Sequence, residues 1–170
     1  MKKLALFLVV LLFLGISSGC GKKQISLNPE KGQDITVLTM DGNLTSLNDD
    51  QQRELDIVMR WMDRDIIQSL NRSGFNATLI KKRNDYNKGM GKLLIIDVAA
   101  FNPGSRAARA FVGYGAGAAS LDLDYVLLND NGGELLRWKD GVGSSKGGTY
   151  CAQTLNRNAV AKVVHYVNNN

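Results

Sequence analysis

The chain has 170 residues, of which 44% are hydrophobic and 22% charged, and its formal net charge is +5. These values are typical of a globular protein and leave enough chain for one compact domain once an N-terminal segment is set aside. The charge is small, and no stripe of Lys and Arg is interleaved with aromatic residues, which disfavours a nucleic-acid-binding protein.

Residues 1–19 have the three zones of a targeting segment. Two lysines come first, an unbroken apolar run follows at 4–14, and small residues lead to Cys20. The apolar run is too short to span a bilayer as a stable helix. The motif Ser17-Ser18-Gly19-Cys20 resembles the bacterial lipoprotein signal, in which the cysteine is lipidated and becomes the new N-terminus. We therefore expect a signal peptide and a lipidated Cys20; a general secretory signal with an incidental cysteine is the alternative.

The lipoprotein resemblance implies a protein tethered to a bilayer through Cys20. At about 0.8 kcal/mol per buried methylene, a diacylglycerol and an N-acyl chain would hold this anchor in place. Gly21 stands where the inner-membrane retention signal of Gram-negative lipoproteins has aspartate, so the resemblance implies the periplasmic face of the outer membrane. In a Gram-positive cell the same signal implies the outer face of the plasma membrane.

The stretch after the cysteine is rich in Lys, Gln, Asn and Gly and has no apolar periodicity. We expect residues 20–33 to be the lipidated cysteine and a flexible tether, and residues 34–170 to be a single domain. One cysteine remains besides Cys20. This residue, Cys151, opens an apolar helical pattern, and we expect it to be buried as a small hydrophobic residue.

The first half of the domain shows three strands and a helix. A β-rich run at 35–40 predicts the first strand, ended by the turn pair Asp41-Gly42. Asn48 or Asp49 can then cap a helix in which apolar residues recur at helical spacing from Leu55 onward, up to Asn71, and Gly74 provides a stop. The opposite face of this helix, which includes Asp63, reads as solvated.

Two further strands follow the helix, at 75–81 and 93–101. The second of these is apolar at every position from Leu93 to Ile96, so we expect it in the centre of the sheet, covered on both faces.

The second half contains a hairpin and a helix. Strands at 121–128 and 134–140 flank Asn131-Gly132, which suits a hairpin turn, so these strands should be antiparallel neighbours. A loop at 141–148 leads to the last helix. Its predicted buried stripe is Cys151 or Ala152, Leu155, Ala159, Val163 and Tyr166. The order predicts an α+β fold: a two-layer sandwich of an about five-stranded mixed or antiparallel sheet with both helices on one face.

Residues 101–120, which we call the arm, connect two predicted strands and are about three times the usual length of such a connection. Arginine and aromatic residues dominate the energetics of protein interfaces. We therefore predict that the arm and the adjacent hairpin contact a protein partner, and that the contact residues are Arg106, Arg109, Phe111 and Tyr114.

The glycines of the arm allow two other interpretations. Gly113-x-Gly115-x-Gly117 could cradle a phosphate, but a dinucleotide fingerprint follows a strand directly and opens a helix, whereas an alternating strand follows here. Gly113 and Gly117 also have the spacing of a small-xxx-small packing motif, so membrane insertion of the arm is the second alternative.

Several segments of this region suggest a family. They are residues 101–109, residues 113–119, Leu121-Asp122-Leu123-Asp124 and a later Gly-Glu-Leu-Leu. Together they resemble the domain of unknown function 4410, which is found in bacterial lipoproteins. A looser similarity runs to the periplasmic domain of the curli-secretion lipoprotein and to the N-terminal domain of TolB. In the curli-secretion family, a segment like 109–115 contributes to a membrane-crossing hairpin. The resemblance implies the α+β fold and an envelope location, and it makes a subunit of an oligomeric secretion assembly the alternative function.

Candidates for chemistry are few. Asp97, Asp122 and Asp124 are carboxylates in apolar strands, and although they could bind a cation or form an acid/base pair, strand alternation explains them as the solvent side. His165 is the single histidine, so the usual zinc sets cannot be assembled. We predict a non-enzymatic protein with no cofactor and no metal. Its expected partners are the bilayer, through Cys20, and an unidentified envelope protein; a homo-oligomer is left open.

Overall fold

In the computed structural model the described residues are 33–42, 44–87, 89–105 and 117–170. They form five strands, two α-helices and one short 3-10 helix. The elements are β1 (Asp34–Met40), α2 (Asp49–Arg72), β2 (Asn76–Ile80), the 3-10 helix Arg83–Asp85, β3 (Lys92–Asn102), β4 (Ala119–Leu128), β5 (Glu134–Ser144) and α4 (Gly148–Asn169).

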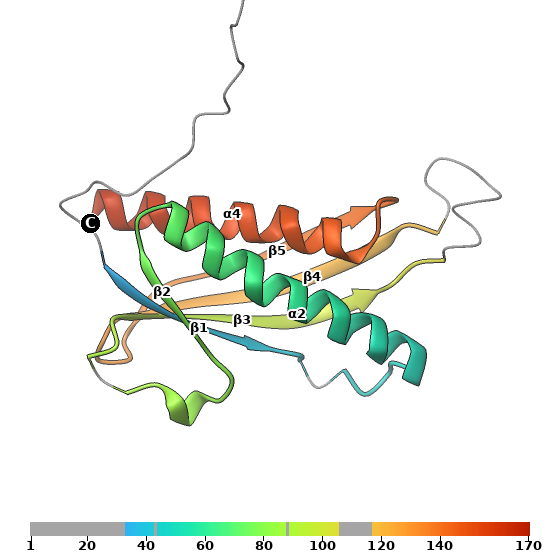
Figure 1. Ribbon diagram of the computed structural model, residues 1–170, viewed down its shortest axis with the longest axis horizontal. Helices are drawn as coiled ribbons and strands as arrows, with labels where there is room; N and C mark the ends of the chain where they lie inside the picture. Colours follow the sequence, from blue (N-terminus) through green and yellow to red (C-terminus); the bar gives the residue numbers. More distant parts are fainter. Residues whose placement is uncertain (1–32, 43, 88, 106–116) are drawn as a thin grey trace, which may run out of the picture.

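The strands form one open, mixed sheet in the order β2-β1-β3-β4-β5. β1 pairs in parallel with both β2 and β3, whereas β3–β4 and β4–β5 are antiparallel. Both α-helices lie on the same face of the sheet and pack against each other (Figure 1). The predicted α+β sandwich is confirmed, and β3 is the central strand as its apolar run indicated.

Because β1 is parallel to β2 and to β3, the connections β1–β2 and β2–β3 must each run back along a face of the sheet. α2 connects β1 to β2 over one face, and the segment from β2 to β3 returns below the opposite face (Figure 1). Tyr86 in this segment packs on a small outer cluster and donates its hydroxyl hydrogen to the carbonyl oxygen of Gly91 at 2.6 Å. The outer cluster consists of Leu38, Ile80, Leu93 and Leu128. β1 is therefore buried on both faces.

The boundaries of α2 follow its local signals. Asn48 caps the N-terminus: its Oδ1 accepts from the backbone N–H of Gln51 at 2.9 Å, and Gln51 Oε1 accepts from the backbone N–H of Asn48 at 3.0 Å. At the other end Gly74 adopts a φ of +97°, which ends the helix at little steric cost.

The main core lies between the sheet and the helices. It includes the stacked rings of Tyr125 and Trp138, whose centroids are 4.6 Å apart. Asn156 is fully buried in α4, and its side-chain N–H groups donate to the Met62 carbonyl oxygen at 3.0 Å and to Asp65 Oδ2 at 2.9 Å, which ties the two helices together. The predicted stripe of α4 is buried except for Tyr166, which is half-buried at the edge of the core.

The prediction of a loop at 141–148 is wrong for residues 141–144, which belong to β5. β5 continues to Ser144 because these residues pair with β4, with Asp122 opposite Gly141 and Ser120 opposite Gly143. A Cβ at Gly141 would lie 2.1 Å from Asp122 Oδ1, so glycine is required where the aspartate lies over the neighbouring strand. The predicted hairpin turn is confirmed: Gly132 has a φ of +85° and donates to the carbonyl oxygen of Asn129 at 2.9 Å.

Candidate functional site

The base of the arm is an antiparallel hairpin. β3 and β4 pair to their ends, where Asn102 lies opposite Ser120, and the backbone N–H of Ser105 donates to the carbonyl oxygen of Gly117 at 3.0 Å. Gly104 has a φ of +69°, and a Cβ there would meet the same carbonyl oxygen at 2.3 Å. The arm thus leaves the sheet from a tightly paired end.

The predicted site residues lie outside the described residues. This holds for the four contact residues of the arm, Arg106, Arg109, Phe111 and Tyr114, and also for Cys20. Their roles remain predictions.

The arm base and the start of the domain lie at opposite ends of the sheet (Figure 1). β1 begins at Asp34, and the neighbouring Lys92 of β3 lies level with Ile35. β3 then runs to Asn102 at about 3.3 Å per residue, a span of about 33 Å. A chain segment entering at residue 33 therefore reaches the domain at the end far from the arm.

A groove of about 540 Å³ opens at the carboxyl ends of the parallel strands β1 and β2, beside α2. Its lining residues come from the ends of β1 and β2, from the middle of β3 and from one face of α2. They are Thr39, Met40, Asp41, Gly42, Asp56, Met59, Arg60, Asp63, Lys81 and Asp97. Crevices at the carboxyl ends of parallel strands are frequent ligand sites, and this volume lies in the usual range for such sites.

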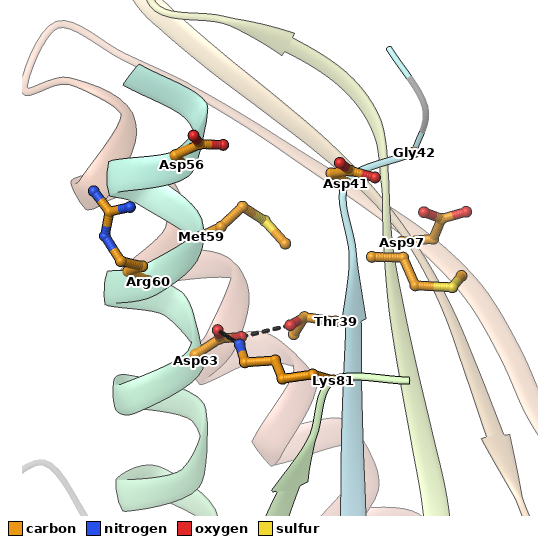
Figure 2. A pocket seen from close by; sticks show the side chains of 10 residues that line it. Thr39, Asp41, Gly42, Asp56, Met59, Arg60, Asp63, Lys81 and Asp97 are labelled. Atoms are coloured by element: carbon orange, nitrogen blue, oxygen red, sulfur yellow. Dashed lines mark hydrogen bonds and ion pairs between the residues drawn. The ribbon is translucent and has the colours of Figure 1, made fainter. Parts of the chain in front are cut away.

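The floor of the groove is held by Asp63. This side chain is buried, contrary to the solvated position expected from the helical pattern. Its Oδ1 accepts from Thr39 Oγ1 at 2.5 Å, and its Oδ2 accepts from Lys81 Nζ (Figure 2). Burial of a carboxylate is tolerated when it is paired and hydrogen-bonded. One partner here comes from β1 and the other from the residue that follows β2.

Met59 gives the groove an apolar wall. Figure 2 shows its side chain pointing from α2 toward β1, with Asp56 above it on the helix and Asp41 across from it at the end of β1. Thioether side chains are polarizable and adapt to many shapes. The groove therefore combines carboxylates with a soft apolar surface.

Asp97 and Asp124 are direct cross-strand neighbours on the sheet face away from the helices. Asp124 forms an ion pair with Lys139 at 2.9 Å, and Asp122 is exposed. Asp97 is half-buried, and its Oδ1 is buried with no hydrogen-bond partner in the part of the chain that the structure describes. Of the three predicted carboxylates only Asp97 lines the groove, so the structure does not assemble them into one acid/base centre.

Burial raises the pKa of the Asp97 carboxyl above its ordinary value, and the charges of Asp124 and Asp41 raise it further. The backbone amides of Gly42 and Val98 act in the opposite direction. The folded protein consequently retains this proton over a pH window in which the unfolded chain has lost it.

The Asp97→Asn variant should be more stable than the parent at neutral pH. Because the raised folded pKa makes stability fall as pH rises through the window above the ordinary value of 3.8, the gain should vanish at lower pH. We expect a rise in melting temperature of roughly 1–3 °C at pH 7, measured by circular dichroism between pH 3 and 8. Asp122→Asn, at an exposed position of the same face, should have a smaller effect. A gain for Asp97→Asn that is equal at pH 3 and pH 7 would contradict the electrostatic cause.

Two further residues were considered for chemistry in the sequence, Cys151 and His165. Cys151 is fully buried, as predicted, and its Sγ lies 3.7 Å from the carbonyl oxygen of Ala119; burial raises the pKa of its thiol. His165 is exposed near the end of α4.

Within the described ranges, no three His, Cys, Asp or Glu side chains are grouped so that they could hold a metal ion. Neither of the two α-helices described has the length and apolarity needed to cross a bilayer.

A family model described as "Domain of unknown function (DUF4410)" matches residues 22–159. No curated protein sequence matches the chain significantly. Three solved structures with a similar fold are a PelC dodecamer from Paraburkholderia phytofirmans, a putative neuraminyllactose-binding hemagglutinin homolog from Helicobacter pylori, and the uncharacterized lipoprotein B from Nitrosomonas europaea.

The sequence identities to these three structures are low. The PelC chain is 10% identical with a TM-score of 0.49, and the match covers 81% of this chain and 89% of that chain. The hemagglutinin homolog is 9% identical with a TM-score of 0.40, covering 87% and 95% of the two chains. Lipoprotein B is 13% identical with a TM-score of 0.30, covering 86% and 88%.

Proposed function

Because the chain belongs to the DUF4410 family, whose function is unknown, we propose a role from its own geometry: it is a non-enzymatic lipoprotein of the bacterial cell envelope whose α+β domain binds a protein partner. Cys20 anchors the protein to the bilayer, on the periplasmic face of the outer membrane. The arm and the adjacent hairpin form the partner surface, with Arg106, Arg109, Phe111 and Tyr114 as contact residues.

The observation that carries this proposal is the position of the arm base. The tether, residues 21–33, would join the domain at the start of β1, while the paired end of β3 and β4 presents the arm at the opposite end of the sheet. A fully extended tether of this length reaches about 45 Å, so the domain can be held off the bilayer. This arrangement favours contact with a protein over insertion of the arm into the membrane that holds Cys20.

The paired base also favours a defined interface. When the two ends of a loop are held together by strand pairing, ordering the loop on binding costs less entropy than when its ends are free. The Ser105–Gly117 hydrogen bond and the close approach at Gly104 supply this registration.

Alanine at all four arm residues should reduce partner recovery at least about tenfold, since arginine and aromatic residues contribute most of the energy at interfaces. The measurement is quantitative mass spectrometry after cross-linking and affinity purification of the lipoprotein from envelopes. The matched control carries alanine at Ile57, Arg64 and Arg157, which are exposed on the two helices.

An unchanged set of partners in the four-residue variant would refute the assignment of the arm. If the partner that is lost is a second copy of the chain, light scattering of the detergent-solubilised protein will show a fall in mass. That result would identify the protein as a subunit of an oligomeric assembly.

A further inference from the structure

β5 forms the longer edge of the sheet, with 11 residues against five in the other edge strand, β2. In the part of the chain that the structure describes, β5 pairs with β4 alone. It contains no proline, and its register with β4 is unbroken from Leu136 to Ser144. A long and regular edge strand has a row of backbone donors and acceptors that another strand can satisfy.

Gly143 is a glycine that the folded subunit does not require. Its φ is not in the left-handed region, and the described atom that a Cβ there would meet is the carbonyl oxygen of Ala119 at 3.8 Å, an ordinary contact distance. Glycine weakens a strand, and where it occurs in one it often marks the close approach of another backbone or a ligand. The exposed face at Gly143 therefore leaves room for a side chain from outside the subunit.

A carboxylate lies over Gly141, two positions earlier on the same face of β5. Asp122 of β4 is directly opposite Gly141, and its Oδ1 is 2.1 Å from the position that a Cβ of Gly141 would take. Asp122 is exposed. This negative charge thus lies above the edge strand itself, where a cation on a neighbouring strand can reach it.

The two cations of β5 exclude some ways of pairing this strand with a second copy of itself. In an antiparallel pair, like charges that lie directly opposite each other are destabilising. A two-fold axis through Lys139 would place this lysine opposite its own copy. An axis through Trp138 would place Arg137 opposite Lys139.

A two-fold axis through Asp140 avoids both conflicts. It aligns the whole regular stretch of β5 with itself, because Asp140 is the middle residue of that stretch. Arg137 then lies opposite Gly143, and Lys139 lies opposite Gly141. Each long cationic side chain faces a residue without a side chain, so both fit on the exposed face of the sheet.

The same register brings complementary groups together on both faces of the sheet. On the face away from the helices, Lys139 of one copy meets the Asp122 carboxylate that lies over Gly141 of the other. On the helix side, Trp138 lies opposite Val142. Trp138 is exposed to 9% and Val142 is half-buried, so this apolar pair extends the core of each subunit across the contact.

We propose that β5 pairs antiparallel with β5 of a second copy of this chain about a two-fold axis through Asp140, which makes the two sheets continuous. Such a contact uses the same surface on both copies. Its cost lies on the axis, where Asp140 faces its own copy; within each subunit Asn158 Nδ2 donates to Asp140 Oδ2 at 2.9 Å. No residue of the arm takes part, so the proposal does not rest on the proposed partner surface.

The test measures self-association of the full-length lipoprotein by sedimentation equilibrium in a density-matched non-ionic detergent, with micelles in excess over protein. We expect a monomer–dimer equilibrium for the parent. Gly143→Lys should raise the dissociation constant of the dimer at least about tenfold, because the new lysine faces Arg137 of the second copy. Gly143→Glu is the matched control: it also adds a side chain, but of opposite charge, and should dimerise at least as tightly as the parent.

Disulfide formation checks the register independently. Asp140→Cys should give a cross-linked dimer under mild oxidation, because the two copies of residue 140 face each other on the axis at a distance that a disulfide can bridge. Arg137→Cys should not, because its two copies are about 20 Å apart along the strands. Efficient cross-linking of Arg137→Cys but not of Asp140→Cys would overturn the register.

Three results would overturn the β5 contact as a whole. They are a parent that stays monomeric throughout the micromolar range, equal dimerisation of Gly143→Lys and Gly143→Glu, and loss of the dimer in the four-residue arm variant, which would assign self-association to the arm. If the arm variant loses its envelope partner and still dimerises like the parent, both proposals are supported. If it keeps its envelope partner, only the assignment of the arm fails.

Discussion

The Cys20→Ala variant should be released from the membrane and recovered in the soluble fraction of the cell envelope. The thiol at this position is the acceptor of the lipid in the proposed anchor, and each methylene that leaves the bilayer removes about 0.8 kcal/mol of binding energy. With two acyl chains of a diacylglycerol and one N-acyl chain lost, no residual affinity should survive an alkaline carbonate wash. Mass spectrometry of the mature N-terminus should show the loss of the lipid adduct.

Cys151→Ala is the matched control for this experiment. Its thiol is fully buried, with Sγ 3.7 Å from the carbonyl oxygen of Ala119, so the substitution should cost some stability and leave the anchor intact. A Cys20→Ala protein that stays in the washed membrane pellet would mean that the N-terminal segment is not processed as a lipoprotein signal.

Gly42→Ala should destabilise the domain by about 3–5 kcal/mol, which corresponds to a fall in melting temperature of roughly 10–15 °C. Gly42 has a φ of +70°, and a Cβ at this position would lie 1.7 Å from the carbonyl oxygen of Val98. That oxygen is part of the central strand and cannot move away without disturbing the sheet, so the substitution adds a steric clash to the strain of a left-handed conformation. Urea unfolding followed by circular dichroism measures the loss.

Gly132→Ala separates the two causes. Gly132 has a φ of +85°, but a Cβ there would meet no atom within 4 Å. It should therefore cost only about 1 kcal/mol, the penalty of the left-handed conformation alone. If both variants lost the same stability, the close approach of Gly42 to β3 would not be what the domain depends on.

Local patterns were sufficient for most of the elements. The capping pair Asn48 and Gln51 and the positive φ of Gly74 set the limits of α2, and Gly132 set the β4–β5 turn, because each of these signals acts within a few residues. The apolar run of β3 indicated a central strand for the same reason: a segment that is covered on both faces needs no polar side.

The structure differs from the sequence-based predictions where residues far apart in the sequence contact each other. Gly141 and Gly143 read as loop residues, yet they extend β5 because β4 continues opposite them. The helical pattern places Asp63 on the solvated face of α2, yet its side chain is buried and bonded to Thr39 of β1 and to Lys81, which follows β2. No local pattern reports which residues of other elements will meet a side chain.

The groove could not be predicted from the sequence, because its lining residues belong to elements that are far apart in the chain. Its carboxylates come from the end of β1, from α2 and from β3, and they lie up to 56 positions apart, at Asp41 and Asp97. The carboxylates that the sequence pattern singles out are Asp97, Asp122 and Asp124, which are close along the chain or on neighbouring strands. Of these, the structure brings only Asp97 to the groove.

The element types and the family resemblance follow from short contiguous motifs, and so do the predictions for the anchor and the arm. That β1 lies between β2 and β3, that the arm base and the start of the domain are at opposite ends, and that a negative groove forms beside α2 became visible only in the folded protein. These features depend on strand pairing and helix packing between segments that are far apart in the chain. The burial of Asp63 and the net charge of the groove arise only when these distant segments come together in the fold.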